Sequence, residues 1–177
     1  DYSHGTHVSG IIGAVTNNSR GVAGVGRNID IIPIRIFEND QVQTASDIAE
    51  AINYAVDQNV DIINMSFGGY NSLTMHEPIK NAYNEGIILV ASSGNYGENE
   101  VLYPARFPET IAVGATDIND NITNYSNEGG NLDLVAPGGS ESTYGILSTS
   151  GYNKDYVEMV GTSMAAPYVS GVAALLL

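Results

Sequence analysis

Cysteine is absent from the 177-residue sequence, which excludes a disulfide framework and any site built on a thiolate. Basic residues are scarce, since 6 Lys and Arg stand against 20 Asp and Glu and leave a net charge of −14. This charge repels nucleic acid and anionic membranes, so we expect neither as a partner. It also favours a secreted or extracellular protein in an open or salty medium, although no signal peptide is visible.

Long apolar runs are lacking as well. The most apolar stretch, residues 164–177, is interrupted by Pro167, Ser170 and Gly171 and is too short to cross a bilayer. The sequence does have 43% hydrophobic residues, enough to favour one folded domain over a disordered chain. We expect residues 1–177 to be a partial domain, truncated at both ends. The chain begins just before a functional-looking histidine and stops inside an apolar helical pattern without a C-cap.

Apolar strand patterns alternate with helical patterns along the chain. Helices are predicted at 4–15, 44–58, 73–85 and from 163 onward, and strands at 29–37, 61–67, 87–91, 110–116 and 132–136. Pro33 indicates an edge or bulged position for the first strand. The alternation predicts an α/β fold of three layers, with a mostly parallel sheet and helices on both faces. Sites in such sheets lie at the carboxyl ends of strands, where Ser66, Gly68, Gly94 and Asn95 stand.

Ser163 is the candidate nucleophile. It follows Gly161 and Thr162 in a turn of small residues and precedes an apolar helix, whose free N–H groups would stabilise negative charge. An N-cap is the ordinary interpretation of such a serine, and Ser163 alone would favour it. Two further stretches change this, because an imidazole can take the serine proton and an amide can stabilise the resulting oxyanion. Ser-His-Gly-Thr-His-Val-Ser-Gly contains His4, and Ala-Ser-Ser-Gly-Asn ends in Asn95.

These three stretches resemble the His, Asn and Ser motifs of the subtilases, the subtilisin-like serine proteases, and the likeness extends over the whole chain. The resemblance implies a subtilisin-like fold and a serine endopeptidase that hydrolyses peptide bonds. It gives Ser163 the role of nucleophile, His4 that of general base, and Asn95 that of an oxyanion donor beside the Ser163 N–H. The family's triad Asp lies well before the His and is absent from this chain, since Asp1 is too near His4.

The same resemblance implies contacts to an extended polypeptide substrate. These residues, which would form backbone hydrogen bonds and the S1 pocket, are Ser66, Phe67, Gly68, Ser92, Gly94 and Leu102. Leu102 would tune the pocket floor and favour an apolar P1 side chain, whereas ordinary strand-end packing explains Phe67 equally well. Met164 would border the leaving-group side, open to oxidation. A pro-segment of the protein itself is a further candidate partner, and we expect a monomer.

Residues 17–22, Asn-Asn-Ser-Arg-Gly-Val, resemble the loop around a subtilase calcium site. Calcium takes about six to eight oxygen ligands. The side chain of Asn18 and the carbonyls of Arg20 and Val22 would supply some of them. The family's other ligands would come from upstream of this chain, and a plain surface turn explains the pattern as well.

Other classes fit less of the sequence. A trypsin-like protease lacks support from paired cysteines or an all-β pattern, and an α/β-hydrolase would need glycine where Ala165 stands and a histidine after the serine. A zinc site at His4 and His7 would need a His-Glu-x-x-His pattern and a third ligand. A non-catalytic calcium-binding or pseudoprotease module of the same fold remains the alternative function, and an upstream sequence without an Asp would favour it.

Overall fold

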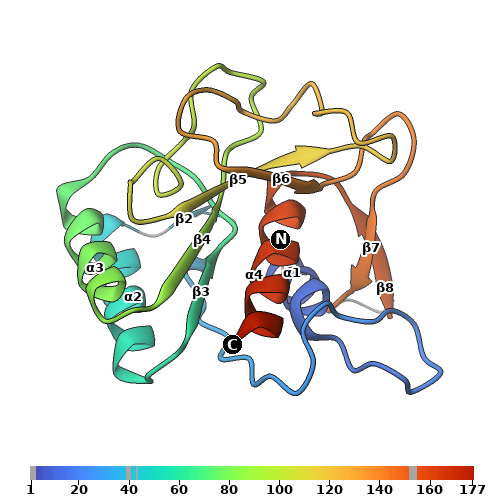
Figure 1. The fold of residues 1–177 in the computed structure, drawn as a ribbon, viewed down its shortest axis with the longest axis horizontal. Helices are drawn as coiled ribbons and strands as arrows, with labels where there is room; N and C mark the ends of the chain where they lie inside the picture. The colour runs from blue at the N-terminus through green and yellow to red at the C-terminus, as the bar shows by residue number, and fades with distance from the viewer. Residues whose placement is uncertain (1–2, 39–40, 43, 152–154) are drawn as a thin grey trace.

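A parallel sheet of four strands lies at the centre of the computed structural model, which describes residues 3–38, 41–42, 44–151 and 155–177 (Figure 1). Its order is β3-β4-β5-β6, from β3 Ile62–Met65, β4 Ile88–Ser92, β5 Ile111–Thr116 and β6 Leu134–Pro137. The register pairs Val90 with Ile111 and Val113 with Leu134. Val90 and Val113 have no exposed surface, which agrees with strands that are covered on both faces.

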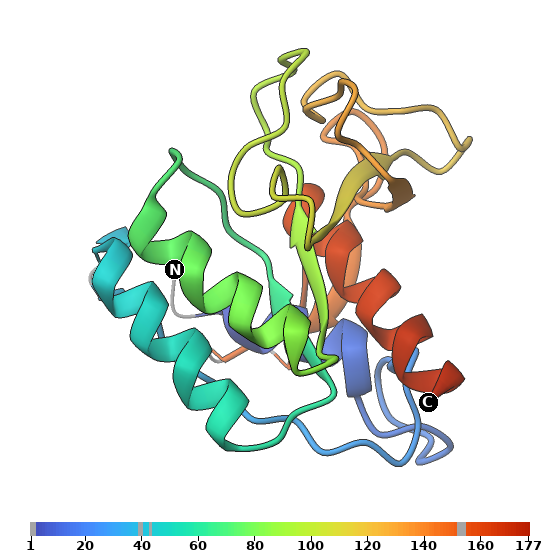
Figure 2. The ribbon, with the colours of Figure 1, turned by 60° about the vertical axis from the view of Figure 1, so that its left-hand side comes forward.

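Helices cover both faces of this sheet, as Figures 1 and 2 show. On one face α2 Ala45–Asp57 and α3 Leu73–Asn84 pack together, and Ile52 and Ile79 join the larger core there. On the other face lies α4 Thr162–Leu176, where Ala165 and Ala166 pack against β4 and β5. The first helix, α1 His4–Gly13, packs against α4. The predicted α/β fold in three layers is therefore confirmed.

An antiparallel hairpin outside the sheet, β7 Ile146–Thr149 and β8 Tyr156–Met159, ties α1 to the later part of the chain. The hydroxyl of Ser148 donates to the carbonyl of His7 at 2.8 Å, and that of Thr149 donates to the carbonyl of Thr6 at 2.7 Å. Glycine at position 10 makes this approach possible, because a Cβ there would collide with both hydroxyl oxygens. The hairpin thereby fixes the first turns of α1.

Local sequence signals explain where two helices begin or end. The Thr44 side chain accepts from the Asp47 N–H at 3.4 Å, and the Asp47 carboxylate accepts from the Thr44 N–H at 2.8 Å, which makes a capping box for α2. Gly86, with φ of +85°, follows the end of α3. None of the helices in the described residues has the length and apolarity that a membrane span requires.

The predicted strand at 29–37 is wrong. Residues 29–36 pair with no strand among the described residues, and only β1 Phe37–Glu38 is extended and paired, antiparallel to β2 Gln41–Val42. An apolar run becomes a strand only where a neighbour pairs its N–H and C=O groups, and Ile31 and Ile32 here are 39% and 42% exposed. Helix α1 also ends two residues earlier than predicted, because the chain turns to ψ of 135° at Ala14.

Candidate active site

Ser163 is the second residue of α4, and the helix itself begins with a glycine cap. Gly161 is the N-cap residue of the helix, with φ of +150°, a conformation that favours glycine. The Ser163 hydroxyl therefore does not serve as the N-cap. It donates instead to the Ser66 carbonyl at 3.2 Å, while the Ser66 hydroxyl donates to the Ser163 carbonyl at 2.9 Å. This exchange places the half-buried Ser163 just beyond the carboxyl end of β3.

Asn95 lies against the same helix terminus. Its Oδ1 accepts from the backbone N–H of Thr162 at 2.9 Å and from the Thr162 hydroxyl at 2.8 Å. Both donors fix the orientation of the amide, so its Nδ2 is the side that faces Gly161, where a Cβ would come within 3.2 Å of it. Asn95 is exposed. An exposed N–H donor thus stands at the start of α4.

Thr162 was missed as a functional residue by the sequence interpretation, which used it only as a small turn residue. It is fully buried, and its hydroxyl accepts from the Gly94 N–H at 3.3 Å while donating to Asn95. One side chain therefore joins the loop after β4 to the start of α4. In the sequence, only its position between Gly161 and Ser163 could have indicated this role.

His4 is the first residue of α1, and this helix lies beside α4 (Figure 1). Val8 and Ile11 of α1 form one apolar cluster with Met164 of α4, so the middle of α1 packs against the first turn of α4. Burial lowers the pKa of half-buried His4 below its ordinary value, and the charge of nearby His7 lowers it further. His4 therefore stays neutral to lower pH than an exposed histidine, as a general base must.

Three of the predicted substrate residues come together at the strand ends. The Leu102 side chain lies where a Cβ on Gly68 would be 3.1 Å away and a Cβ on Gly94 2.9 Å away. Gly69 and Tyr103 pair as an antiparallel bridge that joins the two segments. Gly68, Gly94 and Leu102 are therefore neighbours, in the arrangement that pocket walls and a floor would need.

The other predicted substrate residues point their side chains elsewhere. Ser92 is 3% exposed, and its hydroxyl donates to the Phe67 carbonyl at 3.4 Å. The Phe67 ring packs against the core under α2 and α3, and the Ser66 hydroxyl is used by Ser163. Only the backbones of these residues are placed to meet a substrate.

The loop at residues 17–22 is a tight turn with little to offer a cation. The Asn18 side-chain oxygen accepts from the Arg20 N–H at 2.9 Å, and Asn17 and Ser19 have φ of 56° and 58°. The loop supplies Asn18 Oδ1 and the carbonyls of Arg20 and Val22, all of them neutral oxygens. Among the described residues no group of three His, Asp or Glu side chains is placed to hold a metal ion. These residues alone do not complete a calcium site.

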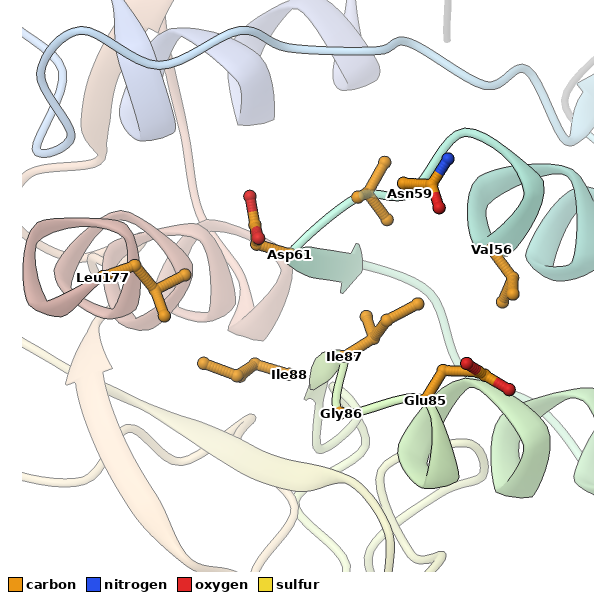
Figure 3. A pocket seen from close by; sticks show the side chains of 9 residues that line it. Val56, Asn59, Asp61, Glu85, Gly86, Ile87, Ile88 and Leu177 are labelled. Atoms are coloured by element: carbon orange, nitrogen blue, oxygen red, sulfur yellow. The ribbon is translucent and has the colours of Figure 1, made fainter.

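A hollow of about 250 Å³ lies at the opposite edge of the sheet (Figure 3). Its lining includes Asp61 and Ile88 at the amino ends of β3 and β4, and Leu177 at the far end of α4. Ser163 lies in the first turn of α4 and Leu177 follows the end of this helix, so this hollow is separate from the candidate active site.

Comparison with known proteins decides the family. The profile of the subtilase family of peptidases matches residues 1–177. The chain belongs to the subtilase family. It is 43% identical to a thermophilic serine proteinase of Bacillus sp. (strain AK1), over 98% of this chain and 42% of that protein. It is 42% identical to the major intracellular serine protease of Bacillus subtilis (strain 168), over 99% of this chain and 56% of that protein.

The fold also matches that of solved protease structures. A protease structure from Pseudoalteromonas arctica PAMC 21717 superposes with a TM-score of 0.91 at 37% identity, over 98% of this chain and 57% of that one. The chain spans 42% and 56% of the length of the two sequence relatives. The architecture of the described residues is therefore that of subtilases.

Proposed function

We propose that the protein is a serine endopeptidase in which Ser163 attacks the carbonyl carbon of a peptide bond. The observation that supports the proposal is that Ser163 lies in the first turn of α4, next to Thr162, whose N–H and hydroxyl are held by the amide of Asn95. In the first step Ser163 Oγ bonds to the carbonyl carbon and its proton passes to His4. Asn95 Nδ2 and the Ser163 N–H hold the oxyanion. His4 then protonates the departing amine, and water releases the acyl group by the reverse sequence.

The remaining parts of the proposal concern what binds. The substrate is an extended polypeptide whose P1 side chain enters the space between Gly68 and Gly94, with apolar Leu102 below it. An Asp from outside residues 1–177 orients His4. A pro-segment of the protein is a partner for the same groove, and the enzyme acts as a monomer. Action outside the cell is supported by the net charge of −14, although one relative is named an intracellular protease. Fractionation of producing cells tests this location.

Ser163→Ala tests the activity. We expect peptide hydrolysis to fall to background in the intact protein, because the attacking atom is removed, while the melting temperature stays within a few degrees. Ser142→Ala, in an exposed loop, is the matched control and keeps full activity. A fluorophosphonate probe should label wild-type protein at Ser163. Labelling at another residue, or hydrolysis by Ser163→Ala, would refute the assignment and leave the pseudoprotease alternative.

Calcium at the 17–22 loop is the structural cofactor in this proposal. Asn18 and the carbonyls of Arg20 and Val22 would hold it, with further oxygens from water or from chain outside residues 1–177. Calcium bound only to the folded protein adds about 2.7 kcal/mol at a hundredfold excess over Kd. We expect a chelator to lower the melting temperature of the intact protein and Asn18→Ala to reduce that change. A melting temperature that does not respond to chelator contradicts the calcium site.

A further inference from the structure

The loop that carries Asn95 is held in place by Asn127, a residue that the sequence interpretation did not single out. The loop, residues 94–102, follows β4, and Asn127 stands in the segment after β5. Both segments lie at the upper edge of the sheet in Figures 1 and 2. Asn127 has no exposed surface, which is unusual for a polar side chain and requires that its hydrogen bonds be satisfied.

All the side-chain hydrogen bonds of Asn127 go to the backbone of this loop. Its Oδ1 accepts from the Tyr96 N–H at 2.8 Å and from the Glu98 N–H at 3.4 Å. Its Nδ2 donates to the Glu100 carbonyl at 2.9 Å. The backbone N–H of Asn127 donates to the Gly94 carbonyl at 3.0 Å. These bonds grip the residues on both sides of Asn95.

Asn95 needs such an anchor because its own side chain is exposed and its loop has no regular structure. Thr162 fixes the Oδ1 end of the Asn95 amide and accepts from the Gly94 N–H, so it holds the backbone just before Asn95. Neither contact reaches residues 96–100. Asn127 is the side chain that holds this later part of the loop, beside the Tyr125 carbonyl that accepts from the Gly97 N–H. A short, rigid amide offers an acceptor and a donor at once, so it can bind N–H and C=O groups of one loop together.

We propose that Asn127 is a positioning residue for the oxyanion donor, and that it acts on catalysis by fixing the backbone from which Asn95 Nδ2 is aimed. The inference rests on the proposed endopeptidase activity. Asn127 touches no reacting atom, so its effect on kcat passes through Asn95, while any effect through the neighbouring Gly94 would change KM. The fall in kcat caused by changing Asn127 cannot exceed the fall caused by removing the donor itself. In subtilisin, another member of the family, removal of this donor lowers kcat about 10²–10³-fold.

A double-mutant cycle in the intact protein tests the proposal. Asn127→Ala should lower kcat about 10–10²-fold with KM little changed, because the donor is misaimed when the oxyanion forms. Asn95→Leu removes the donor itself and should lower kcat about 10²–10³-fold. In the Asn95→Leu background, Asn127→Ala should change kcat by less than about twofold, since there is no donor left to aim. A purely structural role would give the same loss in both backgrounds.

Ser126→Ala is the matched control. Ser126 is buried in the same segment, but its hydroxyl accepts from the Ala115 N–H of β5 and donates to the neighbouring Asn127 carbonyl. This variant should lower the melting temperature and leave kcat per titrated active site unchanged. If Asn127→Ala does not fold, Asn127→Ser is used in the same cycle. A serine hydroxyl is uncharged but too short to hold both the Tyr96 N–H and the Glu100 carbonyl, so kcat should still fall and the loss should still be masked by Asn95→Leu.

Hydrogen exchange gives a readout that does not depend on activity. The Tyr96 amide should be protected in the wild type and in Ser126→Ala, and should exchange faster in Asn127→Ala. Additive kcat losses in the cycle, or lost Tyr96 protection with unchanged kcat, would overturn the positioning role. A wild-type protein with neither hydrolysis nor Ser163 labelling would instead refute the proposed function, so the two failures are distinguishable.

Discussion

At the scale of single residues, His7 is a buried titratable group with an incomplete set of partners. Its Nε2–H donates to the carbonyls of Ile146 at 2.8 Å and Val157 at 3.1 Å. Its Nδ1 is buried with no hydrogen-bond partner among the described residues. Burial lowers the pKa of His7 below its ordinary value of 6.5, although the two carbonyls act in the opposite direction. A proton on Nδ1 would be a buried charge without an acceptor.

This predicts a loss of stability in acid. Below the ordinary pKa of 6.5 the unfolded chain binds a proton at His7 and the folded chain does not. The free energy of unfolding is therefore complete above that pH and decreases as pH falls toward the lowered pKa. The decrease is about 1.4 kcal/mol for each pH unit that separates the folded and unfolded pKa values. His4, whose pKa is also lowered, adds an effect of the same sign.

Urea unfolding of the intact protein on either side of this pH measures the effect. His7→Gln, which can donate to one of the carbonyls but cannot titrate, should show a smaller decrease in acid than the wild type. Equal decreases in the two proteins would mean that His7 does not contribute.

Residue roles were partly accessible from the sequence. The motifs indicated Ser163, His4 and Asn95 through family likeness, and those roles stay predictions here. The expectation that the Met164 side chain is open to oxidation is wrong, because it is 2% exposed and packs against Val8 and Ile11. Consecutive side chains on a helix point in directions about 100° apart around its axis. Which of them faces the core depends on the neighbouring elements, and these cannot be read from the local sequence.

At the scale of elements, glycine at the contact between α1 and β7 carries a clear prediction. Gly10→Ala should destabilise the intact protein by about 1–3 kcal/mol, because the new methyl group would overlap the hydroxyls of Ser148 and Thr149. Gly5→Ala in the same helix is the control. A Cβ there meets nothing within 4 Å, so the better helix former should be neutral or stabilise by roughly 0.5–1 kcal/mol. The midpoints of denaturant unfolding measure both effects. Similar midpoints for Gly10→Ala and Gly5→Ala would contradict the packing argument.

Elements were predictable to the extent that their signals are local. Helix α2 follows from apolar spacing and a capping box within a few residues, and β4 from a short, largely apolar run. The prediction of a strand at residues 29–36 was wrong for the converse reason. A strand requires a paired neighbour, and the segment's own sequence does not show whether one is present. The anchoring of the Asn95 loop by Asn127 was inaccessible for the same cause. It is a contact between two loops, and neither shows a pattern that requires the other.

At the scale of the whole molecule, the net charge of −14 sets a dependence on salt. Like charges on a compact chain repel one another more than on an expanded one, so self-repulsion lowers stability at low ionic strength. The Debye length falls from about 30 Å at about 0.01 M salt to about 3 Å at about 1 M. We expect the melting temperature of the intact protein to rise with sodium chloride over this range. A constant or falling melting temperature would show that favourable ion pairs outweigh the repulsion.

The packing of α1 against α4 also has a consequence in time. These are the first and the last helices of the described chain, and the candidate base and nucleophile stand on one each. A ribosome adding about 5–20 residues per second needs roughly 8–32 s to pass from one to the other. Throughout that interval the nascent chain holds an imidazole without its serine. Under the proposed activity, the attacking group is synthesised long after the base that would activate it, so the growing chain holds no complete Ser–His pair until α4 has been made.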